Sequence, residues 1–180
     1  MSTLTVLGAF PEPPEPPLSA IEMEIQPLDL VTEWRRCGMI ADFMAEYIVH
    51  GFELRETARS VLSTVMNELV ENAAKFSADS RTPARASIRH HGGVVHLEVR
   101  NAATEAHVQR LGGLLAELAE GDANAVWRTR LEDRRGLGLA MLARDYGATV
   151  GATTVSAEDG GRSLTVCLRV ALSAAEVEQR

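Results

Sequence analysis

The sequence predicts an α+β domain in which helices cover one face of a largely antiparallel β-sheet. Three features lead to this fold class: long amphipathic helical segments, a strand pair joined by Gly92-Gly93, and a second strand pair near the C-terminus. Each strand pair is contiguous in the chain, whereas a parallel α/β fold would alternate strands with helices. The 180 residues, 46% of them hydrophobic, suffice for one such domain with a proper core.

The N-terminal segment is expected to be a Pro-rich disordered tail. Five of the seven prolines lie between Pro11 and Pro17. Proline fixes φ and lacks a backbone N–H donor, so this stretch should be stiff, extended and solvated. The expected organisation is therefore a tail (1–20), a single domain (21–172, with its core at 54–170) and a polar C-terminal tail (173–180).

A first helix is expected from about residue 30 to 48. Apolar residues recur there at steps of three and four and form one stripe. They are Leu30, Trp34, Cys37, Ile40, Met44 and Tyr47. The stripe fits either packing against the domain or the surface of a homodimer, and the pattern alone does not distinguish the two.

The remaining elements are a second helix, two hairpins and the helices between them. Turn residues and changes of hydrophobic period mark their ends. The expected helices are 54–76, 104–130 with soft breaks at its glycines, and 138–146 capped by Gly147. The expected strands are Ala84–His90, Val94–Val99, Thr149–Ser156 and Ser163–Val170, the last two joined at Asp159-Gly160-Gly161.

Charge and composition exclude several classes of function. A net charge of -7 argues against a nucleic-acid binder, which needs a basic face. No apolar run approaches the ~18 residues of a membrane span, and no signal peptide is evident, so we expect a cytoplasmic protein. Cys37 and Cys167 are too isolated to indicate a disulfide framework or a zinc site. His90 and His91, adjacent on a strand, face opposite sides and are expected at the surface.

The helix at 54–76 carries the strongest functional pattern. Wound at about 100° per residue, it gathers its polar side chains on one side, away from the apolar stripe. They are Asn67, Glu68, Glu71, Asn72 and Lys75. A solvated helix face accounts for the charged residues, but two asparagines in mid-helix need another reason, because asparagine is a mediocre helix former.

The pattern Asn67-Glu68-x-x-x-Asn72-Ala73-x-Lys75-Phe76-Ser77 resembles the N-box of the GHKL (histidine kinase-like) ATPase superfamily. The resemblance implies a two-layer α/β sandwich of the Bergerat type that binds ATP and Mg²⁺. It makes Asn72 the magnesium ligand and places Lys75 near the phosphates, in keeping with the oxygen ligands that Mg²⁺ prefers. Glu68 stands where anti-sigma-factor serine kinases carry the carboxylate that accepts a proton from an attacking hydroxyl.

A glycine segment follows in the expected order along the chain. Glycines at a helix start leave backbone N–H groups open to anions, and the neighbouring arginines add positive charge. A dinucleotide fingerprint is excluded, because no strand precedes Gly136 and Met141 occupies the third glycine position. The segment resembles the superfamily's second glycine box, and Gly161–Leu168 resembles its closing motif. The nucleotide-binding residues implied there are Arg135, Gly136, Leu137, Gly138 and Thr165.

The adenine-binding motif departs from the family pattern. Asn101 stands where the family carries an aspartate, and Ala102 and Ala103 follow it in place of a glycine-rich turn. The side-chain oxygen of Asn101 can accept the same hydrogen bond from an adenine amino group, as a neutral acceptor. SiaB-type regulators, which act in partner switching, show similar departures.

The resemblance implies an ATP/Mg²⁺-dependent serine/threonine protein kinase-like regulator of bacterial partner switching. Its expected partner is a STAS-domain or anti-sigma-antagonist type protein, with a PP2C-type phosphatase or a response regulator in the same pathway. The alternative is a catalytically weak pseudo-kinase that regulates by protein binding only, which the change at Asn101 motivates. The acidic charge disfavours a DNA-linked or scaffold role.

Overall fold

The computed structural model describes residues 3–13, 16–52, 54–133, 136–156 and 163–179. Six described strands form one sheet in the order β1-β5-β6-β4-β3-β2, and every pairing is antiparallel. The strands are β1 (Leu4–Gly8), β2 (Ser19–Ile25), β3 (Ala84–His90), β4 (Val94–Thr104), β5 (Thr149–Ser156) and β6 (Ser163–Ser173). The helices are α1 (Pro27–Thr32), α2 (Arg35–Phe52), α3 (Glu56–Phe76), α4 (Glu105–Glu120), α5 (Ala123–Asp133), α6 (Leu137–Tyr146) and α7 (Ala174–Gln179).

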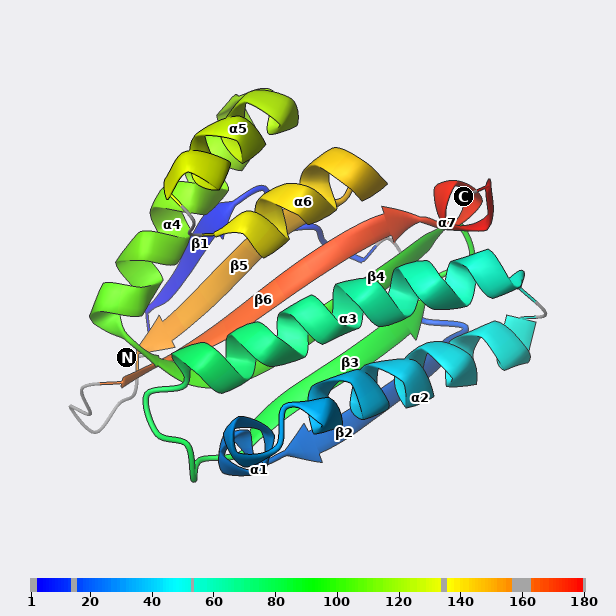
Figure 1. The fold of residues 1–180 in the computed structure, drawn as a ribbon, viewed down its shortest axis with the longest axis horizontal. Helices are drawn as coiled ribbons and strands as arrows, with labels where there is room; N and C mark the ends of the chain where they lie inside the picture. Colours follow the sequence, from blue (N-terminus) through cyan, green and yellow to red (C-terminus); the bar gives the residue numbers. More distant parts are fainter. Residues whose placement is uncertain (1–2, 14–15, 53, 134–135, 157–162, 180) are drawn as a thin grey trace.

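Helices α2, α3, α4 and α6 lie over the same face of the sheet, with α3 crossing its middle (Figure 1). The apolar core lies between α3 and the strands beneath it, where Leu62, Leu69, Ile88 and Leu97 are fully buried. The α+β class and the antiparallel sheet are therefore confirmed, and the architecture is compatible with a two-layer α/β sandwich. None of the described helices combines the length and apolarity that crossing a membrane requires.

The N-terminal segment is not a tail, and that prediction is wrong. β1 and β2 pair with β5 and β3 at opposite edges of the sheet. After β1, residues 10 and 11 are anchored to the face opposite the helices: Arg169 Nη1 donates to the Pro11 carbonyl (2.9 Å), and its guanidinium lies 4.3 Å from the Phe10 ring centroid. The strand signal was the strict alternation in 19–25, whose Ile21, Met23 and Ile25 face the core.

A buried ion pair holds this second face. Arg169 donates two hydrogen bonds to Glu98 Oε2, from Nε (2.8 Å) and Nη2 (2.7 Å), and the carboxylate is 6% exposed. Arg100 adds a 3.2 Å contact to Oε1. Burial raises the pKa of Glu98, but hydrogen bonding and attraction from Arg169 outweigh burial and leave that pKa below its ordinary value.

Several helix boundaries differ from the expected ones. The first predicted helix is two, because Glu33 adopts a non-helical backbone (φ -146°, ψ 88°) between α1 and α2. In the helix expected at 104–130, the predicted break at Gly121 is confirmed, because α4 ends at Glu120 and α5 begins at Ala123. The break predicted at Gly112-Gly113 is wrong, because α4 continues through both glycines. The C-terminal tail is wrong as well, since α7 buries Val177 to 2% exposure. The first hairpin and the Gly147 cap are confirmed, whereas the predicted turn at 159–161 falls outside the described residues.

The three histidines near the first hairpin predict an acid-sensitive fold. His90, His91 and His96 are all buried, contrary to the surface position expected for the first two. Burial, followed by the nearby His91 and Arg169, lowers the pKa of His96 to about 4 from 6.5. The neutral ring is thus favoured in the folded state. The preference for a neutral His96 stabilises the folded state fully above pH 6.5. This stabilisation is lost as the pH falls toward 4, and the total loss is at most about 3 kcal/mol of unfolding free energy.

Urea unfolding from pH 7.5 to 4 measures this loss. We expect His96→Gln to lower stability at pH 7.5 but to flatten its decline below pH 6.5. His50→Gln, a change at an exposed histidine of α2, serves as the control and should leave the decline unchanged. An equally steep decline in His96→Gln and the unmodified protein would exclude His96 as the cause.

Candidate functional site

A cavity of about 1020 Å³ lies beside α3, with α4 and α6 on its other side and strands β4 and β6 as its floor. The floor is apolar and includes Val99, Ala103, Val166 and Leu168. Residues singled out by three sequence motifs, the N-box, the adenine-binding motif and the glycine box, meet here although they lie far apart in the chain. Those that line the cavity are Glu68, Asn72, Lys75, Asn101, Gly136, Leu137 and Gly138. Arg135 falls outside the described residues.

The polar side of α3 divides into two rows. Asn67 donates to Glu71 (3.0 Å) and Lys75 donates to Glu71 (2.6 Å), which makes one row at steps of four. The hydrogen bond from Lys75, above all, lowers the pKa of Glu71. The second row, Glu68 and Asn72, points into the cavity. The sequence placed all five residues on one side, and packing of α3 between α2 and α6 separates them.

Lys75 connects the two rows. Its side chain lines the cavity, yet its ammonium group pairs with Glu71 and lies 5.4 Å from the ring centroid of Trp34. The side chain is 47% exposed, so this ion pair contributes little to stability. The ammonium group of Lys75 is therefore only weakly held by Glu71.

The carboxylate of Glu68 lies against the start of α6. A Cβ at Gly138 would collide with Glu68 Oε2, so position 138 requires glycine for as long as Glu68 occupies this place. The partial positive charge of a helix N-terminus favours a carboxylate here. Burial, then repulsion from Glu71, nevertheless raises the pKa of Glu68. A carboxyl group with a raised pKa is a better proton acceptor than an exposed glutamate.

Gly136 shapes the turn that precedes α6. It adopts the left-handed conformation (φ 67°), and a Cβ there would lie 2.9 Å from Leu114 Cδ2 on α4. Glycine is therefore required both for the backbone angle and for the close approach to α4. The turn places the N-terminus of α6, at Leu137 and Gly138, at the wall of the cavity, and the unpaired N–H groups of a helix N-terminus suit an anion.

Asn101 lies on β4 at the end of the cavity near the last turn of α3. It is buried, and its Nδ2 donates to the Ala102 carbonyl (3.0 Å) and Ser77 Oγ (3.4 Å). With Nδ2 used as the donor, the side-chain oxygen is the remaining acceptor of this cavity residue. The apolar floor of the cavity and the acceptor on Asn101 together suit a flat apolar ring that carries a hydrogen-bond donor at its edge.

Arg130 of α5 is a cavity residue that the sequence analysis missed. It pairs with Glu117 of α4 (2.6 Å), and its Nε is buried without a hydrogen-bond partner in the described part of the chain. Such an atom is costly unless something else satisfies it. No motif marks Arg130, which lies at the end of an ordinary charged helix; only the tertiary fold brings it beside Gly136.

Thr165 is the predicted site residue that the structure places elsewhere. Val166 and Leu168 of β6 face the cavity, and successive side chains of a strand point to opposite faces. Thr165 thus shares the other face with Arg169 and is exposed there. A side chain on that face cannot reach the cavity, so the predicted role of Thr165 in nucleotide binding is wrong.

Comparison with known proteins shows a likeness in fold and none in sequence. No protein-family model and no curated protein matches the sequence. The fold is similar to that of a chain in the crystal structure of the SiaB–SiaC complex from Pseudomonas aeruginosa, with a TM-score of 0.65 and 18% sequence identity. The likeness covers 87% of this chain and 91% of that chain. At this identity, what is shared is the fold.

The contact between Glu68 and Gly138 predicts an energetic coupling. Gly138→Ala adds a methyl group where the carboxylate lies, so the Glu68 side chain must move aside. Because only the end of a flexible side chain is displaced, we expect a cost of no more than about 1 kcal/mol. In a Glu68→Ala background the same change should stabilise the protein slightly, because the obstacle is gone and alanine favours a helix more than glycine does. Thermal or urea unfolding of the four proteins measures the coupling.

Gly113→Ala is the matched control for this cycle. Gly113 also lines the cavity, but nothing lies within 4 Å of a Cβ there, so the change should be neutral or stabilising in both backgrounds. Equal costs of Gly138→Ala with and without Glu68 would contradict the coupling.

Proposed function

We propose that the cavity binds ATP with Mg²⁺ and that the protein is a serine/threonine kinase-like regulator of bacterial partner switching. The observation that carries the proposal is the convergence of the Glu68–Asn72 row, the glycine turn at 136–138 and Arg130 around one cavity. Each group matches one part of a metal nucleotide. Amide oxygen suits Mg²⁺, and helix N–H groups with a guanidinium suit phosphates.

The residues present fit this ligand. A volume of about 1020 Å³ accommodates a nucleotide, and the apolar floor suits a purine ring. Asn72 would hold the Mg²⁺, and Asn101 would accept a hydrogen bond from the adenine amino group. The buried Nε of Arg130 lacks a partner among the described residues, which an anion at the glycine turn would supply.

Glu68 is the residue suited to proton transfer. ATP supplies a γ-phosphoryl group, and the acceptor would be a serine or threonine hydroxyl of a partner protein. Glu68 would take the hydroxyl proton on its carboxylate as that oxygen bonds to phosphorus and the bond to ADP breaks. Its raised pKa supports this role, as does its position beside the glycine turn.

A protein partner is supported from two sides. The sequence motifs resemble those of anti-sigma-factor kinases and SiaB-type regulators, and the similar solved structure is itself a complex of two proteins. We propose a STAS-domain or anti-sigma-antagonist type partner, with a PP2C-type phosphatase or a response regulator opposing or feeding the same pathway.

Regulation by binding alone is the second candidate. It is favoured by Asn101-Ala102-Ala103, which lacks the flexible turn of active relatives, and by the carboxylate of Glu68 at the glycine turn, where it repels phosphate. Nucleotide binding and phosphotransfer therefore need separate tests.

Calorimetry with ATP in the presence of Mg²⁺ tests binding. We expect one site with a dissociation constant in the micromolar range, weaker by at least about tenfold when Mg²⁺ is chelated. Asn72→Ala should remove most of the Mg²⁺ dependence. Asn67→Ala, the same change on the same helix but outside the cavity, is the control. No heat of binding at about 1 mM ATP would overturn the ATP proposal.

Phosphotransfer from ATP to a candidate STAS-domain protein tests catalysis. Glu68→Gln should slow transfer by about 10²-fold or more and leave ATP binding nearly unchanged, because it removes only the proton acceptor. Glu71→Gln, in the neighbouring row, should retain most of the rate. Transfer at the unmodified rate by Glu68→Gln would exclude Glu68 as the base. ATP binding without any transfer would favour regulation by binding alone.

A further inference from the structure

The end of the cavity beside the last turn of α3 is formed by a tight junction between β4 and α4. β4 passes into α4 without a loop, because β4 ends at Thr104 and α4 begins at Glu105. Thr104 Oγ1 accepts a hydrogen bond from the backbone N–H of His107 (3.3 Å) and so caps the first turn of α4. This cap fixes the place of His107, whose partly buried side chain lines the cavity.

The ring of His107 is held by the end of α3. Its Nδ1 lies 3.2 Å from the carbonyl oxygen of Phe76, and its ring packs edge to face against the Phe76 ring, with 5.3 Å between the centroids. A carbonyl oxygen can only accept a hydrogen bond, so Nδ1 carries the proton in this contact. In the neutral imidazole Nε2 then has a free lone pair and is an acceptor. The contact with Phe76 thus decides which nitrogen of His107 can accept.

A backbone carbonyl group also fixes the polarity of Asn101. Its Nδ2 donates to the carbonyl of Ala102 (3.0 Å) and to Ser77 Oγ (3.4 Å), which leaves its side-chain oxygen as an acceptor. Ser77 directly follows Phe76 in the chain, so adjacent residues hold Asn101 and His107. Two carbonyl groups therefore use up the donors of both side chains, and two acceptors remain at one end of the cavity.

Two acceptors at one place suit a ligand group that carries two donors. The exocyclic amino group of adenine has two N–H bonds and meets this requirement. An oxopurine such as guanine or hypoxanthine has a carbonyl oxygen at the same place, which cannot donate and would face two other acceptors. A site that leaves buried polar groups unpaired with the wrong ligand discriminates strongly against that ligand.

We propose that Nε2 of His107 accepts the second N–H of the adenine amino group, beside Asn101, and so makes the cavity select adenine over an oxopurine. The inference rests on the proposed binding of ATP and adds the residue that chooses the base. The other end of the cavity is the glycine turn, where Glu68 lies against Gly138. Phe76 is two helical turns from Glu68, about 12 Å along α3. His107 is thus placed to contact the base and not the phosphates, which all nucleoside triphosphates share.

Calorimetry with ATP and with inosine triphosphate (ITP), each with Mg²⁺, tests the selection. ITP carries a carbonyl oxygen in place of the amino group. We expect the unmodified protein to bind ATP at least about tenfold more tightly than ITP. His107→Asn keeps a donor for the Phe76 carbonyl but has no atom in the place of Nε2. It should raise the dissociation constant of ATP about five- to tenfold and change that of ITP by less than about twofold.

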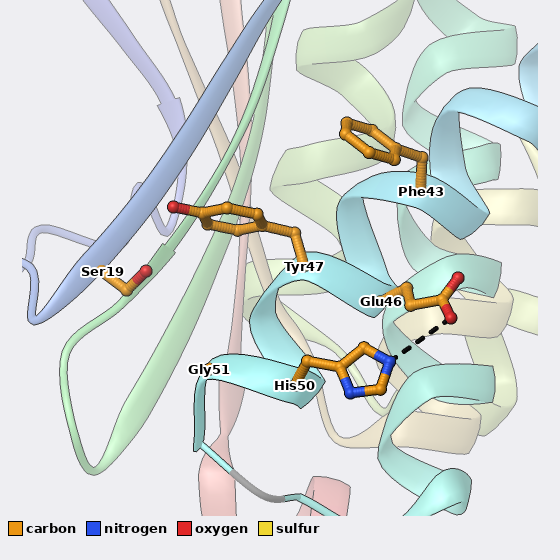
Figure 2. Close-up of a pocket in the computed structure, with 6 residues that line it drawn as sticks. All are labelled: Ser19, Phe43, Glu46, Tyr47, His50 and Gly51. Carbon is orange, nitrogen blue, oxygen red and sulfur yellow. Dashed lines mark ion pairs between the residues drawn. The ribbon is translucent and has the colours of Figure 1, made fainter.

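Two further variants separate base selection from a merely structural role. His107→Phe keeps a ring against Phe76 and should reduce the preference for ATP as His107→Asn does. His50→Phe makes the same change at an exposed histidine of α2, which pairs with Glu46 in a separate hollow (Figure 2), and should alter neither constant. A histidine that only supports Phe76 would tolerate His107→Asn, and His107→Phe would then weaken both nucleotides equally. Either result would overturn the inference.

Nitrogen NMR of the nucleotide-free protein measures the tautomer of His107 independently of any ligand. At mildly alkaline pH, where histidine side chains are neutral, we expect the proton on Nδ1. A proton on Nε2 would overturn the inference even if ATP binds. Equal affinity for ATP and ITP would overturn this inference alone, whereas failure of both nucleotides to bind would overturn it together with the proposed function.

Discussion

The packing of α3 across the sheet is the constraint on which the other features depend. Its apolar rows, which include Leu62, Val65, Leu69 and Ala73, are buried against the strands and cannot rotate without exposing the core. Helix geometry ties every other position to those rows. Once Leu69 and Ala73 face the sheet, Glu68 and Asn72 must face α6. The candidate site thus derives its geometry from core packing, which stabilises it far more than the weak contacts among its own polar groups would.

The opposite face of the sheet is held by a different kind of force. Glu98 and Arg169 pair at its centre, and Arg169 also binds the Pro11 carbonyl and the ring of Phe10. A buried ion pair of this kind contributes little net stability, because desolvation offsets the attraction, but loss of one member leaves the other charge unpaired. The main effect of the pair is therefore to fix the position of the Arg169 guanidinium, which in turn holds Phe10 and Pro11 against the sheet. Phe10 and Pro11 thus lie on the face of the sheet that the helices leave uncovered.

Elements that follow from local sequence patterns could be predicted from the sequence. Features that depend on contacts between distant parts of the chain could not. β3, α6 and the polar row of α3 follow from periodicity, turns and caps, and all lie where expected within a few residues. The prolines concealed β1 and β2, because a polyproline pattern indicates a solvated tail unless something such as Arg169 binds it. Arg130 carried no signal at all. Thr165 was misplaced because a shift of one residue in a strand reverses the face of every side chain.

The two polar rows of α3 meet at Lys75. This side chain lines the cavity, while its ammonium group pairs with Glu71 and lies 5.4 Å from the ring centroid of Trp34. Each of these contacts is weak by itself, since the groups are partly exposed. If an anion in the cavity attracted Lys75, Glu71 would lose its partner and Trp34 its neighbouring cation. Binding of such an anion would then oppose these two contacts, and by linkage the contacts would weaken binding of the anion to the same extent.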